Sequence, residues 1–204
     1  MYIPAHYRNN DLDEVLSFIR KNAFAILVSR GTSQPEASHI PLEVEVAEDK
    51  RIFLHGHISR ANPQWKNFKE DEAVLAIFNG PHAYVSSQWY NHANVPTWNY
   101  IAVHVTGRLK IISEDKLYQS LKKLVDHYEE GSSNPVAMER MPSDMIDKYL
   151  KGIVGFTIEA EKIEGKWKLS QNRNEEDYRN IIRELEQIND VNAKLVAEEM
   201  KRRN

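Results

Sequence analysis

The sequence predicts a mainly β protein with flanking helices, in which about six antiparallel strands form a barrel and a helical tail follows. Short apolar segments separated by turn residues recur from residue 24 to residue 163, as is typical of antiparallel strands. Helical periodicity is found at residues 10–22, within residues 113–150 and in the chain after Glu175. The hydrophobic fraction of 41% is that of an ordinary globular protein with a packed core.

The first element is expected to be a short amphipathic helix. Asn10 is placed to cap its start, and Asn22 is an end signal. Apolar residues recur between them at helical spacing: Leu12, Val15, Leu16 and Ile19.

Three extended segments are expected next, at residues 24–29, 37–46 and 51–58. Turn residues separate them at 31–36 and 48–50. We therefore expect residues 24–58 to form an antiparallel meander.

The middle of the chain combines a short helix with further strands. Pro63 suits an early helical position and predicts a short helix within residues 60–71. Strands are expected at residues 73–78, 83–87 and 100–112, the first two joined through Asn79, Gly80 and Pro81.

A helix is expected after Ser113, ending in the loop of residues 131–135. Ser143 is placed to cap another helix, at residues 144–150, and a β segment follows at residues 153–163.

A charged helical tail begins at Glu175, and polar residues divide it into two pieces at Asn189, Asp190 and Asn192. We expect a barrel domain of residues 1–173 and a helical extension of residues 174–204, packed on the barrel or on a partner subunit.

Composition excludes several classes of function. The chain has no cysteine, so disulfides, thiolate metal sites and a catalytic thiol are excluded, and a reducing cytoplasm is the expected location. The net charge of -3 gives no general attraction to nucleic acid, so DNA contact is possible only through a local patch such as residues 201–203. We find no Ser/His/Asp nucleophile signature, P-loop or Rossmann fingerprint, and no apolar stretch or leader that predicts membrane insertion or secretion.

Two histidines form the first candidate site. Side chains repeat every two residues along a strand, so His55 and His57 are expected on one face. Such a pair lines a polar pocket or holds a metal, but no carboxylate or cysteine lies at ligand spacing, so we assign no metal. Gly56 between them allows close approach of a ligand or backbone.

A polar segment follows directly and forms the second candidate. Ser59 and Arg60 supply a hydroxyl and a planar donor fork at the expected start of a helix, which suits an anion. The alternative is an ordinary ion pair of Arg60 with Glu70 or Asp71.

Two further clusters have polar and aromatic character. The first indicates either a core or dimer interface or a site for a flat heteroaromatic ligand, and comprises Trp89, Tyr90, Trp98 and Tyr100. The second, at residues 166–173, offers donors for phosphate or ring carbonyls, or else is a loop with a helix cap at Asn172 or Asn174.

In chain order these clusters resemble the PaiB-type FMN-binding proteins, which are described as negative transcriptional regulators. The matching strings are MYIPAHY (1–7), SHIPL (38–42), HGHISRANPQW (55–65), GPHAYVSSQWY (80–90), VPTWNYIAVHVTG (95–107), IVGF (153–156) and EGKWKLSQNR (164–173).

The resemblance implies a split β-barrel of the FMN-binding type, with paired flavin sites at the interface of a homodimer. By analogy with pyridoxamine-phosphate oxidases, Ser59 and Arg60 grip the flavin phosphate, although Ala61 stands where a lysine is expected. The other cofactor-binding residues implied are Ser38, His39, His55, His57, Gln64, Trp65, Ser86, Ser87, Trp98, Gln171 and Arg173.

Three functions follow as expectations. The first is negative regulation of sporulation and protease synthesis genes, by an indirect route, because we find no helix-turn-helix, zinc finger or basic face. The second is an FMN-dependent oxidoreductase acting on a small molecule, for which no catalytic acid is obvious. The third is haem binding, with the iron held by one of four histidines: His39, His55, His57 or His104.

Overall fold

The computed structural model describes residues 1–69 and 72–203, and it contains two compact units. The terminal unit comprises residues 1–22, 78–104 and 164–204, and the central unit comprises residues 23–77 and 105–163. The two C-terminal helices belong to the terminal unit, and the predicted boundary between residues 173 and 174 stays a prediction.

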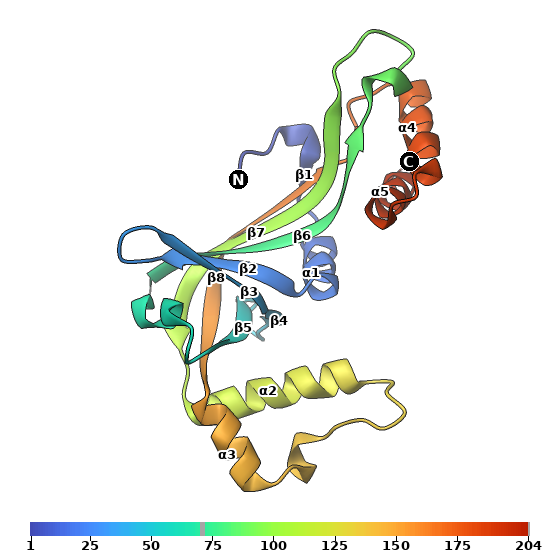
Figure 1. Cartoon of the computed structure of the whole chain (residues 1–204). Coiled ribbons are helices and arrows are strands. Elements are labelled where there is room, and N and C mark those ends of the chain that lie inside the picture. The colour runs from blue at the N-terminus through green and yellow to red at the C-terminus, as the bar shows by residue number, and fades with distance from the viewer. Residues whose placement is uncertain (70–71, 204) are drawn as a thin grey trace. The chain divides into compact units, whose positions relative to one another are not determined.

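The described residues form an eight-stranded, mainly antiparallel sheet, which confirms the predicted fold class. The sheet has more strands than the six or so that were predicted. The strand order is β3-β2-β6-β7-β8-β5-β4, and β1 pairs with β8 (Figure 1). The strands are β1 Arg8–Asn9, β2 Phe24–Arg30, β3 Pro35–Pro41, β4 Glu43–Val46, β5 Ile52–Ser59, β6 Glu72–Val85, β7 Thr97–Ile111 and β8 Ile153–Lys168.

The predicted meander is wrong. β3 pairs with β2 and β4 pairs with β5, so the two hairpins lie at opposite ends of the strand order. The expected single strand at residues 37–46 breaks at Leu42, whose backbone N–H donates to Ala23 O at 2.9 Å and whose side chain is fully buried. Within the central unit β3 also contacts β5, as a sheet that curls into a barrel requires.

The turn expected between residues 78 and 83 is also absent from the described chain, because β6 runs through it without a break. A Cβ on Gly80 would lie 2.6 Å from Phe18 Cε2. The glycine therefore allows close packing of α1 residues against the strand, and this tertiary contact overrides the local turn signal.

The helices follow the predictions with shifts at their starts. The helix α1 Leu12–Lys21 is capped by Asp11, whose carboxylate accepts from Glu14 N at 3.0 Å, and not by Asn10. Pro142, and not Ser143, precedes α3, and the short helix after β5 is a 3₁₀ helix. The tail divides where predicted, since Asp190 caps the last helix.

The helices and 3₁₀ helices of the described chain are η1 Ala5–Tyr7, α1, η2 Pro63–Asn67, η3 Ser87–Trp89, α2 Glu114–Glu129, η4 Met138–Arg140, α3 Ser143–Lys151, α4 Glu175–Gln187 and α5 Val191–Lys201. In the central unit α2 packs against β5 and α3, and in the terminal unit α4 packs against α5 and η3. Figure 1 shows α2 beside α3 and α4 beside α5. None of the helices in the described residues is long and apolar enough to span a membrane.

Gly56 is packed too closely for a side chain. A Cβ at this position would lie 2.6 Å from Leu42 Cδ2 and 2.9 Å from Phe156 Cζ, both of which are fully buried residues. We expect Gly56→Ala to lower the free energy of unfolding by about 1–3 kcal/mol in urea denaturation. Gly152→Ala, whose nearest contact would be Tyr149 O at 3.3 Å, is the control and is expected to cost less. Equal stability of the Gly56 variant and the wild type would contradict this packing argument.

Candidate functional site

Strand β5 presents a polar row on one face. Leu54, Gly56 and Ile58 are buried, while His55 and His57 are half-buried on the opposite face. The prediction that the two histidines share a face is therefore confirmed. Ser59 continues this face at the end of the strand and is exposed.

Burial controls the charge of these histidines. Desolvation lowers the pKa of His57, and it lowers the pKa of His55 against the opposing effect of the Glu45 carboxylate. His55 Nε2 lies 3.6 Å from Glu45 Oε2. Both imidazoles are thus favoured in the neutral form at pH 7. Among residues 1–69 and 72–203 no group of three or more His, Cys, Asp or Glu is arranged to hold a metal ion.

Arg60 is held at the end of β5 by the backbone between α3 and β8. Its Nε donates to Lys151 O at 2.8 Å, and Nη2 donates to Ile153 O at 3.1 Å. The guanidinium lies 5.5 Å from the ring centroid of Trp65, whose indole N–H donates to Arg60 O. A guanidinium has five N–H donors, and these two hydrogen bonds occupy two of them. The alternative partners, Glu70 and Asp71, lie outside the described residues.

The expected anion site at the start of a helix needs a correction. The helix η2 is a five-residue 3₁₀ helix, and its Gln64 N–H already donates to the Asn62 side chain at 3.0 Å. Capping by Asn62 therefore uses a donor that the prediction assigned to an anion. Ser59 and Arg60 side chains remain as the donors of this segment.

Gln64 ties this loop to the sheet. The residue is 2% exposed, and its Nε2 donates to Ser29 Oγ at 2.9 Å and to two backbone carbonyls. Its Oε1 accepts from Ser38 Oγ at 2.6 Å, and Ser38 in turn accepts from Asn62 Nδ2 at 2.8 Å. The structure thus brings Ser38 and Gln64 together, with their polar atoms used inside the protein. Their role as cofactor ligands stays a prediction.

His39 lies beside Ser38 on β3 and is exposed. Its ring stacks on Phe24, with the centroids 6.2 Å apart.

The remaining predicted residues belong to the terminal unit. Ser86 caps η3, which starts at Ser87, and Gln171 bonds to the backbone of residues 167 and 169 within its own turn. Arg173 lies 4.9 Å from the ring centroid of Tyr90. These residues are placed in their own unit only, so their contact with a shared ligand stays a prediction.

The aromatic residues do not form one core. Tyr90 is buried, whereas Trp98 is 52% exposed and contacts His82 and Tyr84 at ring-centroid distances of 6.2 and 5.9 Å. Lys168 donates to Trp98 O at 2.6 Å. The pKa of Lys168 is lowered, chiefly by burial and further by the nearby charge of Lys166. The Trp98 ring is therefore partly open to solvent, as an interface or a flat ligand requires.

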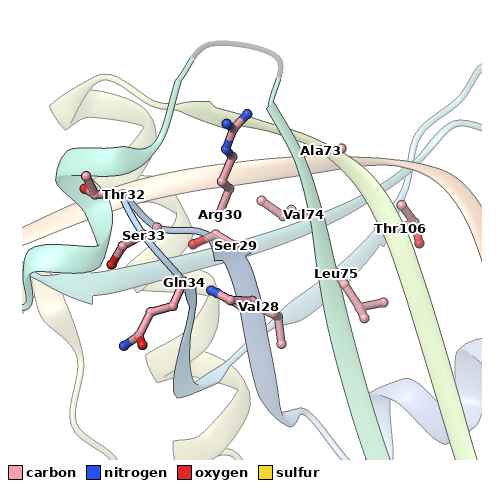
Figure 2. A pocket seen from close by; sticks show the side chains of 12 residues that line it. Val28, Ser29, Arg30, Thr32, Ser33, Gln34, Ala73, Val74, Leu75 and Thr106 are labelled. Carbon is pink, nitrogen blue, oxygen red and sulfur yellow. The ribbon is translucent and has the colours of Figure 1, made fainter.

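Two cavities of the central unit contain residues that the sequence did not single out. One cavity, of about 530 Å³, lies at the β2–β3 turn, where Figure 2 shows Arg30 extending from the end of β2 and the hydroxyls of Thr32 and Ser33 on the turn. The other, of about 620 Å³, is lined by β4, β5, β8 and α2 and includes His55, Glu43 and Thr157. The alternation of polar and apolar residues along β4 is a sequence signal for a polar face at the second cavity. The sequence does not show which strands pair with β4, so the cavity itself was not predicted.

Comparison with known proteins gives a family match. Residues 1–162 match the family model described as "Putative FMN-binding domain". Protease synthase and sporulation protein PAI 2 of Bacillus subtilis is 42% identical over 200 residues, covering 98% of this chain and 96% of that protein.

Solved structures give the same fold at low sequence identity. The FAD and heme binding protein from Mycobacterium smegmatis superposes with a TM-score of 0.62 at 14% identity, covering 85% of this chain and 79% of that one. The flavocytochrome Anf3 from Azotobacter vinelandii gives a TM-score of 0.60 at 17% identity, with coverages of 87% and 78%.

Gln64→Leu tests the hydrogen-bond network of the loop. The substitution removes the hydrogen bonds that Gln64 makes with two backbone carbonyls and with the Ser29 and Ser38 hydroxyls, so we expect a loss of about 1–3 kcal/mol of unfolding free energy. Urea denaturation measures it, and Gln119→Leu at an exposed position of α2 is the matched control. Equal losses in both variants would contradict the structural role of Gln64.

The lowered pKa of His57 predicts a pH dependence of stability. Between the folded pKa and the ordinary value of 6.5, the unfolded chain binds more protons than the folded one. The contribution of neutral His57 to the free energy of unfolding is therefore fully present above pH 6.5, and it falls as the pH decreases from 6.5 through the folded pKa. Urea denaturation from pH 7.5 to pH 5 should give a shallower decline for His57→Gln than for the wild type, and an identical decline would contradict the prediction.

Proposed function

The chain belongs to the FMN-binding domain family, and on this premise we propose that it binds flavin mononucleotide along the outward face of β5. The supporting observation is the polar row of this strand, in which His55, His57 and Ser59 follow one another on one face and end at Arg60. Four residues of a strand span about 13 Å. FMN is similarly elongated, with a ring at one end and a phosphate at the other.

The donor set fits the two ends of this cofactor. Ser59 and Arg60 are exposed, and a guanidinium with free N–H groups binds phosphate by charge-assisted hydrogen bonds. The half-buried neutral imidazoles of His57 and His55 suit hydrogen bonding to a flavin ring. When bound, FMN supplies redox chemistry, while these side chains bind and orient it.

The contacts that fix the Arg60 side chain support its proposed role in binding the flavin phosphate. Lys151 O and Ile153 O orient the guanidinium, and Trp65 packs against it, so little side-chain freedom remains to be lost on binding. The hydrogen bond between Ser38 and Gln64 further fixes the conformation of the loop that carries Arg60. We assign these two residues, with Trp65, to support of the phosphate site.

A homodimer would complete the site. We propose that Ser86, Ser87, Trp98, Gln171 and Arg173 contact the flavin from the partner subunit. Exposure of the Trp98 ring supports this arrangement, since aromatic residues are enriched at protein interfaces.

For the cellular role we propose negative regulation of sporulation and protease synthesis genes in the cytoplasm, by an indirect route. Its support is the 42% identical relative, whose name refers to protease synthase and sporulation. The net charge of -3 argues against direct contact with DNA as the main interaction.

Two other functions have particular support. A small-molecule oxidoreductase is favoured by the cavity beside His55, and reduction of bound FMN by a nicotinamide cofactor would distinguish it from a regulator. Haem binding is favoured by the names of the two similar structures, which include haem and a flavocytochrome. Candidate iron ligands are His39, His55, His57 and His104, and an absorption spectrum separates haem from flavin.

Arg60→Ala tests the phosphate site. Because it removes the guanidinium while leaving the histidines, we expect the Kd for FMN to rise at least about tenfold in a flavin fluorescence titration. Arg51→Ala, which lies directly before the first residue of β5, is the matched control and should bind FMN as the wild type does. Unchanged affinity in Arg60→Ala, or equal losses in both variants, would contradict the proposed orientation.

A further inference from the structure

A row of three polar side chains crosses three neighbouring strands of the central unit. Glu43 on β4 pairs with His55 on β5, and His55 pairs with Thr157 on β8. Directly paired residues of antiparallel strands project from the same face, with Cβ atoms about 4.5–5.5 Å apart. The three side chains therefore form one continuous row.

Each member of this row has a buried polar atom without a hydrogen-bond partner among the described residues. The atoms are Glu43 Oε1, His55 Nε2 and Thr157 Oγ1. The Glu45 carboxylate, 3.6 Å from His55 Nε2, is too distant for a hydrogen bond. Buried polar atoms are almost always hydrogen-bonded in folded proteins, so three unpaired atoms in one row indicate that another molecule binds them.

The row lines the cavity of about 620 Å³ described above, which is within the size range of small-molecule pockets. Phe53 and Ile112 contribute apolar walls. A ligand with an apolar body and one polar group matches this combination of walls and row.

The chemistry of the row selects the polar group. A carboxylate oxygen only accepts hydrogen bonds, and a hydroxyl oxygen and a neutral imidazole nitrogen can also accept. Burial lowers the pKa of His55 and so favours the neutral ring. A primary ammonium group has three N–H donors and no acceptor, which matches three acceptors.

The charges around the cavity also favour a cation. Lys123 on α2 is paired with Glu45 at 2.8 Å, so its charge is compensated within the protein. Asp115 and Lys116 on the α2 side contribute one charge of each sign. The charge of Glu43 then remains in the row, where an anionic ligand would be repelled.

We propose that this cavity binds a small primary amine with an apolar body, whose ammonium group donates to Glu43, His55 and Thr157. This site shares His55 with the proposed flavin site, whereas Glu43 and Thr157 belong to the amine site alone.

Binding of three matched probes to the full chain tests this proposal by calorimetry or NMR titration. The probes are phenethylamine, the neutral 2-phenylethanol and the anionic 3-phenylpropionate. We expect phenethylamine to bind saturably and at least about tenfold more tightly than the other two. Equal affinities, or no saturable binding of the amine, would overturn the proposal.

Variants locate the site. Glu43→Gln should weaken phenethylamine binding about tenfold, whereas Glu48→Gln, at the exposed β4–β5 turn, should leave it unchanged. Wild-type amine affinity in Glu43→Gln would overturn the proposal. If circular dichroism shows that this variant is unfolded, Thr157→Val takes its place with the same expected direction. Titration without FMN separates the two sites: amine binding by a chain that fails to bind FMN supports this site and removes the proposed flavin function.

Discussion

The register of β5 between β4 and β8 is the constraint on which both proposed sites depend. Leu54, Gly56 and Ile58 must face the core, where Leu54 is fully buried and Gly56 leaves no room for a Cβ. Side chains alternate along a strand, so this requirement directs His55 and His57 to the other face. A slip of one residue would bury the histidines and expose the apolar side chains.

The loop after β5 holds the Arg60 guanidinium, the main donor group of the proposed flavin site, in a defined position. Gln64 uses its amide to join β2, β3 and the loop, and the backbone at Lys151 and Ile153 orients Arg60. Buried networks of this kind are stable only when each member is satisfied. The same central unit leaves three row atoms unsatisfied beside the cavity, so its polar groups divide into structural ones and ones available to ligands.

Local sequence signals were sufficient for most strands, for the α-helices and for the division of the tail at Asp190, but not for the 3₁₀ helices η1, η3 and η4. Period-two alternation also predicted the shared face of His55 and His57. The break at Leu42 and the continuous β6 were not predictable, because they depend on contacts with Ala23 and Phe18 far along the chain. The row of Glu43, His55 and Thr157 requires the pairing of three strands, which local propensity does not encode.

A crystal structure of the chain grown with FMN tests the central claim most directly. The account predicts a phosphate within hydrogen-bond distance of Ser59 Oγ and the Arg60 guanidinium, with the flavin ring beside His57 on the outward face of β5. Flavin density elsewhere, with Arg60 making only its bonds to Lys151 O and Ile153 O, would contradict it.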